Sequence, residues 1–158
     1  MYSPHVDNCA SVCHSLSLKG MRTTIGEGAA TNPFDDIFKT ENIIVMGSNT
    51  TEAHPIVSNR MIKAVRDKIA TLTVIDVRQI QLSKFGEQLI IPYEANLLVL
   101  NMMAYVILSE KLYNKEFIDS RCTGFEEYKD LILNDPYANP EYMKNVSGYE
   151  YLTEQIPT

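Results

Sequence analysis

Three short apolar runs in the middle of the chain are typical of buried β-strands. Residues 42–47 (NIIVMG), 71–77 (TLTVIDV) and 87–92 (EQLIIP) are each rich in isoleucine, leucine or valine, and each is of strand length. Gly47 ends the first run, where it allows a sharp turn of the backbone. The pattern therefore predicts three strands.

Segments of a different pattern separate these runs and follow the last one. Residues 52–69 carry apolar side chains at helical spacing, and residues 79–86 predict a short helix capped by Gly86. Residues 97–110 are apolar nearly all round, so they predict a helix buried against a sheet, with Asn96 as its cap.

Alternating strands and helices at this spacing predict an α/β fold built from βαβ units. Such units form a parallel sheet with right-handed crossovers, and ligands bind beyond the carboxyl ends of its strands. The candidate ligand loops are therefore residues 47–54, 76–79 and 92–96. After residue 114 the pattern predicts short helices over 115–122, 125–133 and 139–146.

Composition and charge exclude several classes of protein. The 158 residues carry a formal net charge of −6, and the 14 lysines and arginines are scattered, which argues against a nucleic-acid partner. The longest apolar run, residues 97–108, is too short to cross a membrane, and no signal peptide pattern opens the chain. Three cysteines without a disulfide pattern fit a reducing compartment. The default expectation is a cytoplasmic protein, or a periplasmic one if an export signal lies upstream.

Two of the three loops contain residues suited to a nucleotide. The loop after Gly47 (GSNTTEAHP) offers hydroxyl and amide donors and leads into a helix whose free N–H groups favour phosphate, although an ordinary turn with a helix cap explains it equally well. Asp76 ends the second strand, where an acid commonly binds ribose, and Arg78 could bind a phosphate. The alternative for these two residues is a surface ion pair.

Cys13 and His14 form the most reactive pair of neighbours in the sequence. A thiolate is a soft metal ligand and a nucleophile, and an imidazole accepts protons near neutral pH. The spacing of Cys9 and Cys13 fits no common zinc or iron–sulfur motif, and Cys122 is expected to be a small buried residue. From these residues alone, a metal site, a cysteine hydrolase and a pair without function all remain open.

Several motifs, in order, closely resemble part of the catalytic subunit of molybdenum- or tungsten-dependent formate dehydrogenases, within the molybdopterin oxidoreductase superfamily. They are CASVCHSLSLKGMRTTIGEGAATNPFDDI, IIVMGSNTTEAHPI, VIDVR and LNMMAYVILSEKLYNKEFIDSRCTGFEEYK. The resemblance covers nearly the whole chain and weakens after about residue 134. The segments VCHS and GSNTTEAHP carry most of it.

The resemblance implies a concrete set of roles. The residue matching Cys13 ligates molybdenum or tungsten, and the residue matching His14 receives the proton as formate is oxidised to carbon dioxide. Two molybdopterin guanine dinucleotides hold the metal, and a Rossmann-like, three-layer αβα domain with a mostly parallel sheet cradles the guanine nucleotide of one of them. By position, the cofactor-binding residues of the three loops are Gly47, Asn49, Glu52, Asp76, Arg78 and Asn96.

The same resemblance divides the chain and implies its partners. Residues 1–42 match the active-site segment, 43–112 the nucleotide-binding core and 113–158 the C-terminal helices of the same domain. The implied partners are the remaining domains of the catalytic subunit and electron-transfer subunits with iron–sulfur clusters, with formate as substrate and no membrane insertion. A 4Fe-4S cluster belongs to the complete subunit and not to this chain, because Cys9 and Cys13 cannot hold one alone.

Two loop positions depart from the family pattern. Val77 stands where a proline is usual, and Glu94 stands where a glycine is usual. A bulky anion at position 94 hinders a close approach of the nucleotide. The chain is thus expected to be a fragment or split piece of a formate dehydrogenase; the alternative is a degenerate nucleotide-binding or interaction module without metal or activity.

Overall fold

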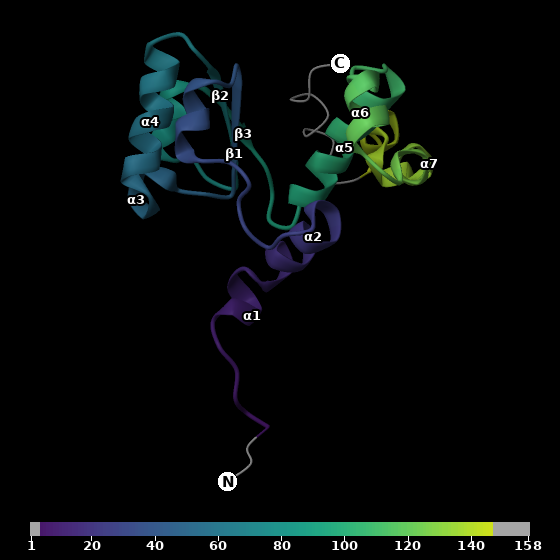
Figure 1. The fold of residues 1–158 in the computed structure, drawn as a ribbon, viewed down its shortest axis with the longest axis horizontal. Helices are drawn as coiled ribbons and strands as arrows, with labels where there is room; N and C mark the ends of the chain where they lie inside the picture. Colours follow the sequence, from purple (N-terminus) through teal and green to yellow (C-terminus); the bar gives the residue numbers. More distant parts are fainter. Residues whose placement is uncertain (1–3, 147–158) are drawn as a thin grey trace.

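The computed structural model describes residues 4–146, and its centre is a three-stranded parallel sheet (Figure 1). The strands are β1 (Asn42–Met46), β2 (Thr71–Asp76) and β3 (Glu87–Ile90), in the order β1-β2-β3. In the register, Ile75 of β2 lies opposite Met46 on one side and Leu89 on the other. All three predicted strands are confirmed.

Helices precede, connect and follow the strands. The α-helices are α1 (Ala10–Cys13), α2 (Ser15–Ile25), α3 (Thr50–Ala53), α4 (Pro55–Arg66), α5 (Asn96–Ser109), α6 (Lys115–Arg121), α7 (Phe125–Asn134) and α8 (Pro140–Met143). The 3₁₀ helices are η1 (Phe34–Phe38), η2 (Gln81–Phe85) and η3 (Pro136–Ala138). The described part of the chain is therefore an α/β domain with helices on both sides of a parallel sheet, which confirms the predicted fold class.

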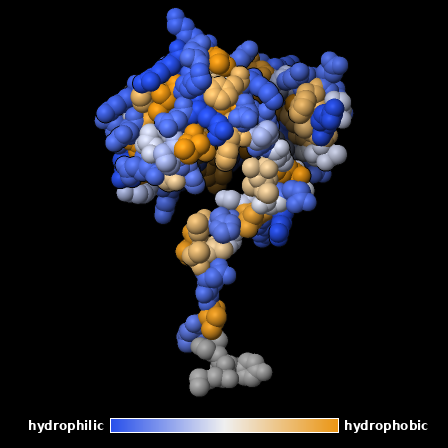
Figure 2. All heavy atoms as spheres, turned by 60° about the vertical axis from the view of Figure 1, so that its left-hand side comes forward, coloured by the Kyte–Doolittle hydropathy of each residue, from blue (hydrophilic) through white to orange (hydrophobic). Residues whose placement is uncertain are grey.

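The first two helices form an arm that extends away from the sheet and its covering helices (Figure 1). We call α1 and α2, residues 10–25, the N-terminal arm. Neither helix has a buried residue, and apolar side chains lie open on the arm (Figure 2). Val12 is 93 % exposed and Leu16 is 83 % exposed.

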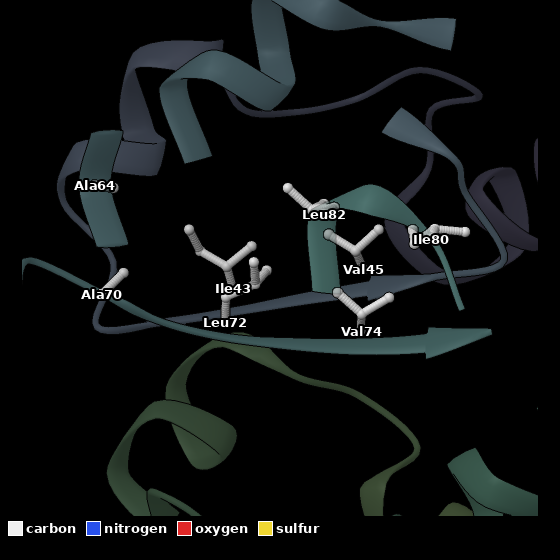
Figure 3. Packing of buried hydrophobic residues seen from close by; sticks show 8 residues of the cluster. All are labelled: Ile43, Val45, Ala64, Ala70, Leu72, Val74, Ile80 and Leu82. Atoms are coloured by element: carbon white, nitrogen blue, oxygen red, sulfur yellow. The ribbon is translucent and has the colours of Figure 1, made fainter. Parts of the chain in front are cut away.

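One face of the sheet is covered by α4 and the two 3₁₀ helices η1 and η2. Alternate residues of β1 and β2 point to this face because successive side chains of a strand point to opposite sides. Figure 3 shows them on the same side of the strands as Ala64 of α4 and Leu82 of η2. The buried cluster consists of Ile43, Val45, Ala64, Ala70, Leu72, Val74, Ile80 and Leu82.

The other face packs against α5 and α8. Ile75 of β2 joins Val99 and Met102 of α5 and Met143 of α8 in a second buried cluster. The predicted packing of this helix against the sheet is confirmed, but it covers only part of the helix, because Leu97, Leu100 and Ile107 are between 40 % and 66 % exposed. Part of the surface of α5 packs in two core clusters, one against the sheet and one with α7 and η3. The rest of its surface is exposed.

The two predicted helix caps fare differently. Gly86 is the C-terminal cap residue of η2, as predicted, and its N–H donates to the Ser83 carbonyl, but its backbone is extended, at φ −160°, and not left-handed. A Cβ atom built on Gly86 would lie 2.1 Å from the carbonyl oxygen of Leu72, so glycine is needed there for close packing. Asn96 is the first residue of α5, and the cap position belongs to Ala95, whose N–H donates to the Pro92 carbonyl in a turn leading into the helix.

The short helices predicted after residue 114 are confirmed. Two of them, α6 and α8, and the 3₁₀ helix η3 begin at side chains that accept a hydrogen bond from a backbone N–H two or three residues later, as helix caps do. These capping residues are Asn114, Asp135 and Asn139. Cys122, which follows α6, is exposed, so the prediction that it is buried is wrong. Among the described residues, every helix falls short of the length and apolarity that a membrane crossing requires.

Candidate nucleotide and metal site

Three loops meet at the carboxyl edge of the sheet because all three strands run in the same direction. Backbone hydrogen bonds tie the first and third loops to β2. The N–H of Gly47 donates to the Ile75 carbonyl at 2.9 Å, and the N–H of Ile91 donates to the Asp76 carbonyl at 3.1 Å. The structure therefore places the three predicted loops along one edge of the sheet.

The first loop turns sharply at Gly47, whose φ of +60° favours glycine. A Cβ atom added there would meet no other atom within 4 Å, so the space beside Gly47 is open. Asn49 precedes α3 but makes no capping bond; its side-chain oxygen accepts from the Thr51 hydroxyl at 3.0 Å. Glu52 is exposed on α3. The side-chain nitrogen of Asn49 and the Glu52 carboxylate have no hydrogen bond to the described residues, which leaves both available to a ligand.

The second loop is organised by Asp76, which is only 8 % exposed at the end of β2. Its Oδ1 atom accepts from the backbone N–H of Arg78 at 3.1 Å, which shapes the turn. The side chains of Asp76 and Arg78 form no ion pair in the described structure, contrary to the alternative weighed from the sequence. One carboxylate oxygen of Asp76 and the exposed guanidinium of Arg78 thus remain for a ribose hydroxyl and a phosphate.

The third loop holds Glu94 in a conformation that favours glycine. Its φ is +69°, in the left-handed region, which costs a residue with a side chain about 1–2 kcal/mol. Tyr93 beside it is 80 % exposed, and Asn96 opens α5 with an exposed side chain. The position where the family pattern has glycine therefore requires glycine-like backbone geometry, and Glu94 occupies it under strain.

We expect Glu94→Gly to stabilise the domain by up to about 1 kcal/mol, because it relieves this strain at some cost in unfolded-chain entropy. It should also increase affinity for a guanine nucleotide, because it removes an anion from the binding edge. Thermal unfolding and calorimetric titration measure the two effects. Lys68→Gly is the matched control: Lys68 has φ +56° near the opposite edge, so this variant should be stabilised without any change in affinity. Equal gains in affinity for both variants would contradict the expectation.

Cys13 and His14 lie where the N-terminal arm bends. Cys13 ends α1, and His14, with φ −131° and ψ 1°, separates α1 from α2. Upstream, the Asn8 side chain accepts from the N–H of Ala10. The Ser11 hydroxyl and then the Asn8 N–H donate to Asp7 and lower the pKa of that carboxyl. A network of local hydrogen bonds thus supports the short helix that carries Cys13.

The side chains of Cys13 and His14 are both exposed, and no hydrogen bond joins them in residues 4–146. Nor does any group of three or more histidine, cysteine or acidic residues in that range have the arrangement of a metal site. Cys13 is therefore an open thiol that can supply one soft ligand to a metal whose other ligands come from elsewhere. A cysteine hydrolase would need His14 to activate the thiol and a third group to orient the imidazole, and residues 4–146 provide neither contact.

The family model for molybdopterin oxidoreductase matches residues 5–144. The chain belongs to this family. This molybdopterin oxidoreductase chain is 38 % identical over 148 residues to the F420-dependent formate dehydrogenase subunit alpha of Methanocaldococcus jannaschii, covering 92 % of this chain and 21 % of that protein. It is 37 % identical over 145 residues to formate dehydrogenase H of Escherichia coli, and this alignment covers 91 % of this chain and 20 % of that protein. The chain thus spans about a fifth of the length of these relatives.

The residues of this molybdopterin oxidoreductase chain fit the cofactor that the family name implies. The open space beside Gly47, the oxygen of Asp76 without a hydrogen bond to the described residues and the exposed guanidinium of Arg78 suit the phosphate and hydroxyl groups of such a cofactor. The exposed thiol of Cys13 suits a metal that already has sulfur ligands. Sequence reasoning missed one residue of this edge: the side chain of Gln88 on β3 donates to the Arg78 carbonyl, a contact that no sequence motif signals.

Proposed function

We propose that this chain is the nucleotide-binding domain of a formate dehydrogenase catalytic subunit, which oxidises formate to carbon dioxide. The observation that carries the proposal is the meeting of three ligand-ready loops at one sheet edge, in a chain that also presents an exposed Cys–His pair. The names of the relatives, all formate dehydrogenases, support the substrate.

In the proposed site the cofactor is a pair of molybdopterin guanine dinucleotides with molybdenum or tungsten, which would supply the acceptor for the two electrons of formate. Cys13 would hold the metal through its sulfur, which is a soft donor. His14 accepts the proton of formate on an imidazole nitrogen. The residues that bind the guanine nucleotide are Gly47, Asn49, Glu52, Asp76, Arg78 and Asn96.

The exposed arm supports the proposed partners. Val12 and Leu16 flank the Cys–His pair, and an apolar surface of this kind is normally covered by other protein. In the proposal, the remaining domains of the catalytic subunit cover it and bring the other ligands of the metal. Electron-transfer subunits and a 4Fe-4S cluster outside this chain carry the electrons away.

The domain boundaries proposed from the sequence agree with this division of labour. Residues 1–42 would carry the metal ligand, 43–112 the nucleotide edge and 113–158 the supporting helices. Residues 1–3 and 147–158 of this scheme lie outside the described residues.

The nucleotide part of the proposal predicts that Asp76→Asn weakens binding of guanosine diphosphate by about tenfold, because a ribose hydroxyl loses a charged acceptor. Titration calorimetry on the chain measures it. Asp67→Asn is the control, since Asp67 follows α4 near the opposite edge, and its affinity should equal that of the parent. An unchanged affinity in Asp76→Asn would remove Asp76 from the site.

A second candidate is a degenerate nucleotide-binding or interaction module of the same fold, without metal. The strained Glu94 in the third loop favours this second function, because a bulky, negatively charged side chain hinders the close approach of a nucleotide to the backbone. Co-purification separates the two functions. A polypeptide with the missing domains, recovered together with molybdenum or tungsten, supports the formate dehydrogenase; a metal-free partner supports the module.

A further inference from the structure

Gln88 makes a long-range contact at the nucleotide edge that the proposed function does not use. It lies on β3 opposite Val74, and its side chain reaches the loop that follows β2. There its Nε2 atom donates to the backbone carbonyl of Arg78 at 3.0 Å. A side chain of β3 thus holds the loop that follows β2.

This contact completes the support of Arg78. The N–H of Arg78 is held by Asp76 Oδ1, and its carbonyl is held by Gln88 Nε2. Both polar groups of one residue are therefore fixed by side chains from two neighbouring strands. The loop cannot turn away from the sheet edge without breaking at least one of these bonds.

The other end of the Gln88 amide offsets the stability that the contact contributes. Its Oε1 atom is buried and has no hydrogen-bond partner within residues 4–146. An unpaired buried acceptor destabilises a fold, whereas an apolar side chain of similar size beside Val74 would avoid that penalty. Rotating the amide would not help, since the oxygen would then face the Arg78 carbonyl. Glutamine is thus an unfavourable choice for packing at a position where it holds a ligand loop.

We propose that Gln88 is a positioning residue for the nucleotide edge: it fixes the Asp76–Arg78 turn so that the free carboxylate oxygen and the guanidinium meet one nucleotide together. This inference rests on the proposed function, because it assumes that the edge binds a nucleotide. Gln88 itself acts through the backbone of Arg78 and need not touch the ligand.

The test compares Gln88→Leu with the parent chain, using guanosine diphosphate as the probe. We expect the dissociation constant for guanosine diphosphate to rise about five- to tenfold, because the variant loses the one hydrogen bond that holds the Arg78 carbonyl in place. The amide of Arg78, which donates to Asp76 Oδ1, should exchange with deuterium faster, while the thermal midpoint stays the same or rises. A merely structural glutamine would instead lower the midpoint. Gln81→Leu, at an exposed position of η2, is the control and should change neither affinity nor exchange.

The outcomes separate this inference from the function on which it rests. If the parent chain binds guanosine diphosphate and Gln88→Leu binds it equally well, the positioning role is overturned and the proposed function stands. A fall in the thermal midpoint that accounts for the loss of binding also overturns it. If the parent itself does not bind guanosine diphosphate, the proposal that this edge binds a nucleotide is overturned, and the positioning role is overturned with it.

Discussion

Cys13→Ser, placed in a complete formate dehydrogenase alpha subunit that carries this chain as its matching segment, should lower formate oxidation by more than about 100-fold. Even residues that only orient a metal ligand change affinity or activity by about 10–100-fold, and Cys13 is proposed as the ligand itself. A serine hydroxyl is a hard donor that stays protonated, so it is a poor substitute for a thiolate. Formate-dependent reduction of a dye and metal content by mass spectrometry measure the two consequences.

His14→Gln in the same subunit should lower the turnover number by about 10²–10⁴-fold while the metal is retained, because only proton acceptance is removed. Cys9→Ser is the matched control for both variants, since Cys9 is an exposed cysteine one helical turn before Cys13. Its activity should equal that of the parent. Normal formate oxidation in Cys13→Ser or His14→Gln would overturn the role assigned to that residue.

Gly86→Ala should destabilise the domain by about 3 kcal/mol or more, since the new methyl group would overlap the main chain of β2. The added Cβ would lie 2.1 Å from the Leu72 carbonyl oxygen and 2.8 Å from the Leu72 Cβ. The neighbouring atoms belong to a buried strand and cannot rotate away, so β3 would have to shift, and backbone shifts of this kind cost about 1–3 kcal/mol or more. Urea unfolding of the chain measures the loss.

Gly20→Ala is the control for this substitution because it adds the same methyl group in open space. Gly20 lies inside α2, and a Cβ there would meet no other atom within 4 Å. Alanine favours a helix over glycine by about 1 kcal/mol, so the arm should gain helix content, seen by circular dichroism. Equal stability of Gly86→Ala and the parent would show that β2 and β3 do not approach as closely as described.

The three strands could be predicted because each is a short apolar run bounded by polar or turn residues. Leu72, Val74 and Ile75 of β2 are almost completely buried, as such a run requires. Details that depend on tertiary contact could not be predicted. Gly86 has the spacing of a helix cap, yet the carbonyl of Leu72, 14 positions earlier, decides its role.

For the candidate site, the position of the loops could be predicted but the contacts between them could not. The topology of a parallel sheet alone indicates that residues 47–54, 76–79 and 92–96 share an edge, and the structure confirms this arrangement. The interaction between Gln88 and the Arg78 carbonyl was not predictable, because glutamine on an edge strand is an ordinary solvent-facing residue by pattern. The roles of Cys13 and His14 remain predictions from the resemblance, since their geometry here is only that of two exposed side chains.

The N-terminal arm separates the chemistry of this chain from its folding. No residue of α1 or α2 is buried, so the domain core does not depend on the identity of residue 13. A variant with another donor at that position, whether sulfur, selenium or oxygen, can keep the same sheet and the same nucleotide edge. In the proposed enzyme, the metal ligand could therefore be exchanged in evolution, or in design, without a compensating change in the core, and the reaction could diversify on an unchanged scaffold.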